Sequence, residues 1–148
     1  MDEVKSILNN ALVLLFNLVL KSEEKFLREV GCKDLSINEI HVIDAIGKKE
    51  DQTMGWVAGE LNVTLGTLTK AINNLEKKEY VKRKRSTKDR RVVFLSLTDE
   101  GRKIFSLHQE FHDNMINEIV ENLSESEERA LMKGLNNLID YFMTNYNN

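Results

Sequence analysis

Apolar residues recur at three- and four-residue spacing through the first thirty residues of the chain. The repeating positions are Ile7, Leu8, Ala11, Leu12, Leu15, Leu18 and Val19. This spacing predicts a helix over about residues 4–30. Further apolar residues, at positions 13, 14, 16 and 20, extend its apolar surface almost all the way round. A helix of that kind has to be covered on several sides, so we expect a second subunit to lie against it.

Capping residues separate this helix from the next one. Gly31 is expected to end the first helix, because glycine readily adopts the left-handed conformation found at helix ends. Ser36 and Glu39 have the spacing of a capping box, in which each side chain accepts a hydrogen bond from the other residue's backbone. They predict a second helix over about residues 36–46.

Two short helices joined by a tight turn are predicted farther along the chain. Thr53 can cap a helix that ends near Leu61, and Thr64 can cap another that ends near Lys78. Asn62 begins the turn between them. This arrangement matches the helix-turn-helix pattern. In the second of these helices, the positions predicted to pack inward are Leu68, Ile72 and Leu75.

The periodicity changes after residue 80. A basic segment, Lys82–Ser86, and an apolar, β-branched segment, Val92–Leu97, are separated by a polar turn at residues 87–91. Such a pair predicts a β-hairpin.

Two amphipathic helices complete the chain. Thr98 can cap the first, which extends to about Asn122, and Ser124 with Glu127 forms a capping box for the second. Their apolar stripes are Ile104, Leu107, Phe111, Met115, Ile116 and Ile119 in the first, and Leu131, Leu135, Leu138, Ile139 and Phe142 in the second. The sequence therefore predicts a mainly α fold with a small β-hairpin wing, a winged helix-turn-helix, in a single domain of residues 1–148.

The composition agrees with a mostly helical chain, since 41% of the residues are hydrophobic, 30% are charged and none is proline. The one cysteine, Cys32, excludes an intramolecular disulfide and suits a reducing compartment. The apolar run at 11–20 is interrupted by Asn17, and a membrane-spanning helix needs roughly 20 apolar residues. No signal-peptide pattern surrounds it. We therefore expect a cytoplasmic protein with no membrane partner.

The net charge of −3 conceals a strongly basic segment. Between Lys77 and Arg91, nine basic and two acidic residues give +7, which leaves −10 for the rest of the chain. A concentrated basic patch on an acidic body is typical of a protein that meets phosphate with one face. A solvated surface is the alternative interpretation. The position of the patch on a hairpin directly after a helix-turn-helix favours double-stranded DNA as the partner.

No sequence motif supports an enzyme. The P-loop, G-x-G-x-x-G, nucleophile-elbow and H-E-x-x-H patterns are absent, and Cys32 has no sequence-defined base beside it. A redox-sensing cysteine and a pure protein-interaction module are further alternatives. The first has no recognisable environment in the sequence, and the second leaves the basic segment unexplained. No cofactor is expected.

Candidate DNA contacts follow from the predicted elements. A helix fits the major groove, where small polar side chains and asparagine reach base edges. On the outer side of the second helix of the helix-turn-helix, the candidates are Thr64, Leu65, Gly66, Thr67, Thr69, Lys70 and Asn73. The threonines have capping and solvation of the helix as an alternative role. On the hairpin, the residues expected to contact phosphates are Lys82, Lys84, Arg85 and Lys88.

The hairpin region resembles that of a known family. The stretch from Asp89 to Gly101 reads D-R-R-V-V-F-L-S-L-T-D-E-G. It resembles the wing motif of the MarR family of bacterial regulators, which is D-x-R, a β run and then L-T-x-x-G, and the order of predicted helices agrees over the whole chain. The resemblance implies that Arg90 or Arg91 enters a narrow minor groove while Asp89 orients the loop.

The same resemblance implies a homodimer on a pseudo-palindromic operator. Dimerisation is expected through the helices at about residues 1–30 and 98–148, and DNA binding through about residues 36–97.

Three shorter strings, at residues 39–41, 63–67 and 107–115, are similar to the fatty-acid-biosynthesis repressors of this family. This similarity implies a response to long-chain acyl groups on acyl carrier protein, with the chain enclosed by the first, second and fifth helices. Arg102 and Lys103 are candidate contacts for that acidic carrier. The alternative is that these apolar surfaces form only the dimer core.

Metal binding is a competing interpretation. His108 and His112 are four residues apart on one helix face, a spacing that can hold a metal ion. Glu24, His41 and Cys32 are residues that could approach them, and zinc-uptake repressors of the MarR family have sites in this region. Two histidines are an incomplete site, so histidines that serve structure and hydrogen bonding are the favoured interpretation.

Overall fold

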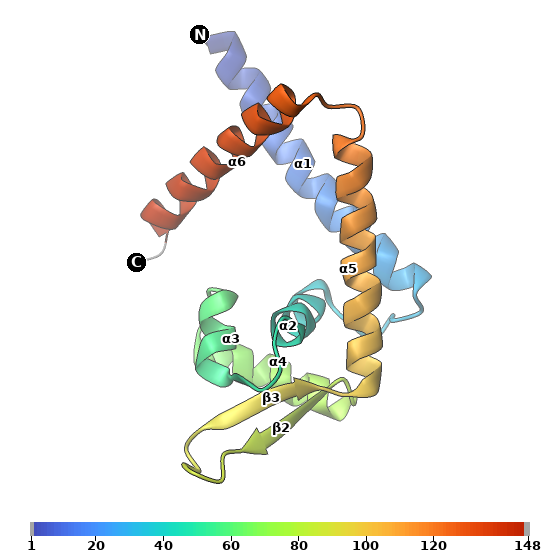
Figure 1. The fold of residues 1–148 in the computed structure, drawn as a ribbon, viewed down its shortest axis with the longest axis vertical. Helices are drawn as coiled ribbons and strands as arrows, with labels where there is room; N and C mark the ends of the chain where they lie inside the picture. Colours follow the sequence, from blue (N-terminus) through green and yellow to red (C-terminus); the bar gives the residue numbers. More distant parts are fainter. Residues whose placement is uncertain (1, 147–148) are drawn as a thin grey trace. The chain divides into compact units, whose positions relative to one another are not determined.

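The computed structural model describes residues 2–146, which form six helices and three short strands (Figure 1). In chain order these are α1 (Asp2–Glu29), α2 (Ile37–Gly47), β1 (Gln52–Thr53), α3 (Met54–Glu60), α4 (Leu65–Lys77), β2 (Val81–Arg85), β3 (Val93–Leu97), α5 (Asp99–Val120) and α6 (Glu125–Tyr146). The mainly helical fold with a β wing is therefore confirmed. The chain forms two compact units, Met1–Phe105 and Ser106–Asn148, whose boundary lies within α5.

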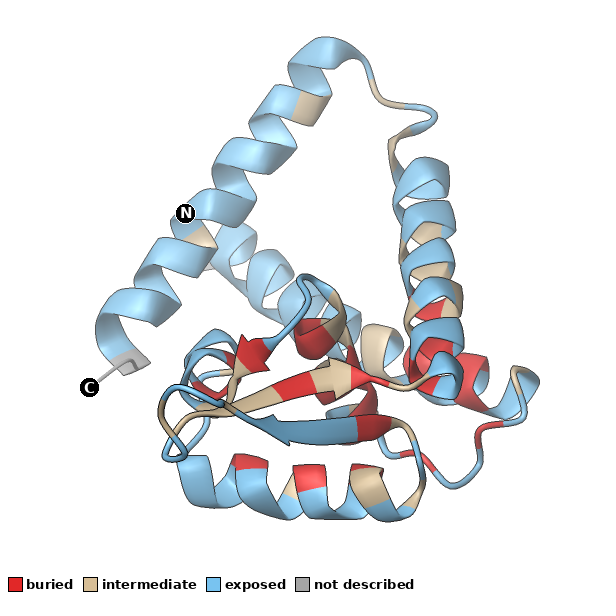
Figure 2. Cartoon of the chain, turned by 60° about the horizontal axis from the view of Figure 1, so that its bottom comes forward, coloured by how far each residue is buried: buried red, intermediate tan, exposed pale blue. Residues whose placement is uncertain are grey.

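The core of the first unit lies among α2, α3, α4 and the sheet. Figure 2 shows the buried positions of α4 turned toward the strands. Each aliphatic side chain removed from water there contributes about 1.5–3 kcal/mol of transfer free energy. The fully buried aliphatic residues are Ile40, Ile43, Ile46, Val57, Leu68, Ile72, Leu75 and Leu95. The three positions of α4 that the sequence predicts to pack inward are among them.

The helix ends follow the predicted capping residues. Gly31 has a φ of +77°, in the left-handed region that favours glycine. Ser36 and Glu39 form both hydrogen bonds of a capping box at the start of α2. The hydroxyl of Thr53 accepts from the backbone N–H of Trp56 and begins α3. The local capping predictions are confirmed.

The sheet has the order β1-β3-β2, and both of its pairings are antiparallel. The hairpin of β2 and β3 is the predicted one, and Val81 lies opposite Leu97 in its register. Strand β1 was not predicted, because two residues are too few to show a two-residue periodicity. Its Gln52 lies opposite Leu95 and ties the start of α3 to the wing.

The start of α5 explains the L-T-x-x-G part of the wing motif. The Thr98 hydroxyl accepts from the N–H of Gly101 at 3.0 Å and donates to the carbonyl of Glu79 at 2.6 Å. A Cβ at Gly101 would lie 2.1 Å from the carbonyl oxygen of Tyr80. Glycine is therefore required where α5 crosses the chain between α4 and β2.

The apolar surface of α1 is largely exposed in the described chain. Its exposed large residues are Val4, Ile7, Leu8, Leu12, Val13, Leu14, Leu15, Phe16 and Leu18. By length and composition, Glu3–Glu29 is apolar enough to cross a membrane. This finding concerns length and composition alone and does not overturn the expectation of no membrane partner. An apolar helix of this length also occurs in soluble proteins that cover it with another chain.

In the second unit, Ser124 and Glu127 form the predicted capping box at the start of α6. The exposed large apolar residues of this unit are Ile116, Ile119, Leu131, Met132, Leu135, Ile139, Tyr141, Phe142 and Met143. Both units therefore carry apolar helical surface that the described chain leaves open to solvent.

Candidate nucleic-acid interface

The first turn of α4 carries small, exposed side chains. The hydroxyl of Thr64 caps the helix by accepting from the N–H of Thr67 at 3.1 Å, and the two hydroxyls lie 3.0 Å apart. Leu65 is 57% exposed although it is apolar, and a Cβ at Gly66 would make only an ordinary contact, at 3.9 Å, with the Thr64 hydroxyl. A helix N-terminus of this kind lets the backbone come close to a ligand and favours nearby phosphate.

Thr69 and Lys70 are two further candidates on α4. The Thr69 hydroxyl donates to the carbonyl of Leu65 at 2.7 Å, so its proton is already used within the helix. Lys70 is exposed on the outer face. The seven predicted outer positions of α4 and its cap thus all lie at the surface, namely Thr64, Leu65, Gly66, Thr67, Thr69, Lys70 and Asn73.

A hydrogen-bonded turn forms the tip of the wing. The Ser86 hydroxyl accepts from the backbone N–H groups of Lys88 and Asp89 at 3.2 and 3.3 Å. The N–H of Val92 donates to the carbonyl of Asp89 at 2.9 Å. These bonds give the tip a defined conformation.

Asp89 and Arg91 form the most specific contact of the tip. The carboxylate accepts from the Arg91 backbone N–H at 3.0 Å, and from Nε and Nη2 at 3.2 Å each. These hydrogen bonds lower the pKa of Asp89. The Arg91 side chain is nevertheless 91% exposed, so its guanidinium is oriented without being covered. Arg90 lies at a depression of the tip with Arg85, Ser86 and Thr87.

The remaining basic residues of the wing follow the alternation of a strand. Lys82 and Lys84 are exposed on one face of β2, whereas Arg83 and Arg85 share the other face. Lys88 is exposed at the tip. The four predicted phosphate contacts, Lys82, Lys84, Arg85 and Lys88, are therefore all accessible.

Arg83 is a residue of this region that the sequence prediction left out. Its Nη1 lies 2.8 Å from Oε2 of Glu76, and its Nη2 donates to Oδ1 of Asn73 at 2.7 Å. Both partners lie on α4. No pattern in the sequence indicates this contact, because it joins a strand to a helix that precedes it.

An ion pair between a buried carboxylate of α2 and a half-buried lysine at the end of α4 joins the two helices. Lys78 Nζ donates to both oxygens of Glu39, at 2.9 and 2.8 Å, and also to the carbonyl of Asp34. Burial by itself raises the pKa of Glu39, but hydrogen bonds from Lys78 and Ser36 outweigh it and hold the pKa below its usual value. The charged pair is therefore the stable form at neutral pH.

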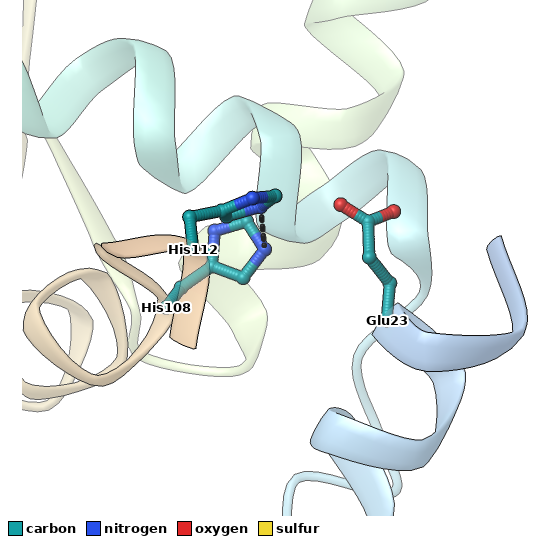
Figure 3. A group of neighbouring side chains, drawn as sticks. All are labelled: Glu23, His108 and His112. Atoms are coloured by element: carbon teal, nitrogen blue, oxygen red, sulfur yellow. Dashed lines mark hydrogen bonds between the residues drawn. The ribbon is translucent and has the colours of Figure 1, made fainter. Parts of the chain in front are cut away.

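The histidine candidates lie in different parts of the chain. In the first unit, the carboxylate that reaches His41 is Glu23, with Oε1 3.0 Å from Nε2, whereas the predicted Glu24 is exposed. In α5, the Nε2 atoms of His108 and His112 lie 3.2 Å apart (Figure 3). Glu23 and Glu24 are adjacent, so their side chains point about 100° apart around α1.

Cys32 is buried, and its burial raises the pKa of the thiol. The Tyr80 hydroxyl lies 4.0 Å from the sulfur and 3.4 Å from Oδ1 of Asp34. A thiol that stays protonated at neutral pH is a weak nucleophile. This environment disfavours the redox-sensor interpretation.

An exposed helix face and a basic hairpin on one unit are the two surfaces with which winged helix-turn-helix regulators meet DNA. The family described as transcriptional regulator SarA/Rot matches residues 26–107. The chain belongs to the MarR family of DNA-binding transcriptional regulators and is not an enzyme.

Individual relatives agree with this assignment. The chain is 48% identical to Streptococcus pneumoniae FabT, whose crystal structure is a complex with DNA; the TM-score is 0.88, and the match covers 93% of this chain and 96% of that one. It is 32% identical to Staphylococcus aureus SarZ, over 82% of this chain and 78% of SarZ. With Bacillus subtilis PchR the identity is 29%, over 79% and 74% of the two chains. SarZ and PchR are both helix-turn-helix transcriptional regulators.

Proposed function

We propose that the protein is a cytoplasmic, homodimeric repressor of fatty-acid biosynthesis genes, whose affinity for a pseudo-palindromic operator rises with long-chain acyl-acyl carrier protein. The observation that carries this proposal is the 48% identity to FabT across 93% of the chain. The winged helix-turn-helix of the first unit is the DNA-binding part.

The dimer is supported by uncovered apolar surface. In α1, Leu8 is 58% and Leu15 is 52% exposed, and in α6, Met132 and Phe142 are 63% and 52% exposed. Leaving so many large apolar side chains in water is unfavourable by about 25 cal/mol for each Å². A second copy of the chain covers such helices in a two-fold interface and brings two DNA-binding units to two half-sites.

The geometry supports a different role on DNA for each of these surfaces. The exposed first turns of α4 enter the major groove, where Thr67 and Lys70 face base edges and Leu65 meets thymine methyl groups. Arg91 enters the minor groove, because Asp89 orients its guanidinium while leaving it 91% exposed. Lys82, Lys84, Arg85 and Lys88 contact phosphates and make binding dependent on salt.

A groove beside α1 and α2 supports the acyl response. It measures roughly 800 Å³ and is lined by Leu20, Leu27, Leu35 and Ile37. Arg28 and Lys33 lie along the same groove, together with one acidic residue, Glu24. An acyl chain would lie against the leucines, and the acidic carrier would face the two basic residues.

The test is operator binding measured with and without the effector. Chromatin mapping identifies the sites that the protein occupies, and fluorescence anisotropy then measures affinity for one of them. We expect palmitoyl-acyl carrier protein to tighten binding, with unacylated carrier protein as the matched control. Bound sites away from fatty-acid genes, or equal affinity with both carriers, would refute the proposal. If operator affinity changes with Zn²⁺ and not with the acylated carrier, the protein is instead the zinc-responsive repressor.

A further inference from the structure

One arginine joins the wing to α4, which is the helix proposed to enter the major groove and is called the recognition helix below. Arg83 extends from β2 and places Nη1 2.8 Å from Glu76 Oε2, while Nη2 donates to Asn73 Oδ1 at 2.7 Å. The side chains of Arg83 and Glu76 are only 30% and 32% exposed. The contact therefore lies partly sheltered between the two elements that reach DNA, and Figure 2 shows α4 running alongside the strands.

The guanidinium of Arg83 can hold two acceptors on α4 at the same time. Asn73 and Glu76 are three residues apart, so they lie on the same face of α4. A guanidinium is planar and has donors in a rigid fork, so it can hold two acceptors at once. An ammonium group on a lysine stem has no such fixed geometry. The arrangement therefore links β2 to two positions on one face of α4.

The contact also adds a role for Asn73. To read adenine in a bidentate manner, an asparagine uses its carbonyl oxygen and its NH₂ group together. In this structure the carbonyl oxygen accepts from Arg83. One lone pair of the Asn73 oxygen is thus used in the connection with the wing, and the second lone pair and the NH₂ group remain for a base edge.

We infer that Arg83 is a positioning residue, which holds the wing at a set distance from α4 by gripping Glu76 and Asn73, and that it acts on DNA affinity without itself contacting a phosphate. This inference rests on the proposed function for its DNA-binding readout. It deepens that function by assigning a role to an arginine, a glutamate and an asparagine on the DNA-facing unit.

Glu76→Gln is the most discriminating variant, because its two possible effects have opposite signs. Removing a negative charge close to DNA strengthens binding if Glu76 acts only through its field. If Glu76 anchors Arg83, the substitution weakens binding. We expect a loss of about threefold per protomer, hence about tenfold for a dimer, as suits a partly exposed ion pair.

The salt dependence separates positioning from phosphate contact. The logarithm of affinity is measured against the logarithm of KCl concentration, for the duplex that the wild-type protein selects from a randomised pool. We expect Arg83→Ala to bind more weakly with an unchanged slope. Lys84→Ala, from the other face of the same strand, is the matched control and should reduce the slope by about one per protomer.

Arg83→Lys and a double variant complete the design. The lysine keeps the charge but loses the fork, so we expect affinity close to that of Arg83→Ala. In the Glu76→Gln/Arg83→Ala double variant, the losses should be less than additive, because both remove one connection. Thermal unfolding of each variant verifies that the protein is folded.

Two results would overturn the inference: tighter or equal binding by Glu76→Gln, or a slope reduced by Arg83→Ala as much as by Lys84→Ala. If the wild-type protein selects no sequence from the pool, the proposed function itself fails, which is a different outcome from either of these.

Discussion

Both carboxylate oxygens of Glu39 accept hydrogen bonds from Lys78 Nζ, at 2.9 and 2.8 Å. These bonds join the start of α2 to the end of the recognition helix. The same carboxylate accepts from the N–H of Ser36 at 2.9 Å, which completes the capping box of α2. The side chain of Glu39 is 8% exposed. One buried acid therefore serves a local purpose, a helix cap, and a tertiary one, the position of α4.

Lys78→Met should destabilise the fold by about 2 kcal/mol, because it leaves the buried Glu39 carboxylate without its cation. The free energy of unfolding in urea measures this effect. Lys77→Met is the control, since Lys77 is exposed at the last residue of the same helix, and we expect a change within about 0.5 kcal/mol. Equal effects of the two substitutions would show that the Glu39–Lys78 pair contributes nothing to stability.

The contribution of Glu39 to the free energy of unfolding should decrease as the pH falls. Its pKa is lowered in the folded protein, so its contribution is complete above the unfolded value of about 4.3 and is lost as the pH falls through the folded value. We expect the difference in unfolding free energy between wild type and Glu39→Gln to be constant from about pH 6 to about pH 8 and to shrink below about pH 4.3. A difference that grows on acidification would mean that the folded pKa is raised.

The wing tip predicts a hierarchy between neighbouring arginines. Arg91→Ala should weaken operator binding by about 1–3 kcal/mol and relax the preference for A·T pairs where the wing enters. Asp89→Ala should produce part of the same loss, because Arg91 is then no longer oriented. Arg90→Ala should weaken binding to all sequences alike. Anisotropy on the selected operator and on an A·T-to-G·C variant measures all three, and a larger loss of preference in Arg90→Ala would reverse the assignment.

Gly101→Ala should cost about 3 kcal/mol or prevent folding, because the added methyl group would lie 2.1 Å from the Tyr80 carbonyl oxygen. Gly59→Ala, in α3, is the matched control. A Cβ there meets nothing within 4 Å, so the higher helix propensity of alanine should leave stability equal or slightly raised. Thermal and urea unfolding compare the two. A Gly101→Ala protein as stable as wild type would mean that the chain between α4 and β2 moves aside at little cost.

Acidic substitutions on α1 test the dimer. Leu8→Glu/Leu15→Glu should give a helical monomer with much weaker operator binding, because both side chains are exposed in the chain alone and we expect a partner to cover them. Asn10→Glu/Asn17→Glu adds the same charges at the same seven-residue spacing and should remain dimeric. Sedimentation equilibrium gives the mass, and circular dichroism gives the helix content. Monomers from both variants, or from neither, would contradict the proposed interface.

The sequence by itself determined every feature that depends on neighbouring residues. Helix starts at Ser36, Thr53 and Thr64 follow from side chains that reach a backbone N–H three residues away, and this geometry needs no distant partner. The hairpin followed for the same reason, since its two strands are separated by a short polar turn. The wing motif also indicated the family, although its threonine and glycine meet a tertiary requirement, since both lie against the backbone at Glu79 and Tyr80.

Only the tertiary structure decided which side chains meet across elements. Strand β1 exists because β3 offers it an edge, and Arg83 reaches Glu76 because β2 packs beside α4. Glu23, rather than its neighbour, reaches His41, and α1 is so apolar that its pattern does not indicate which carboxylate turns inward. Periodicity records how polar each face of an element is. It does not record which other element lies against that face, and the roles of these residues depend on that.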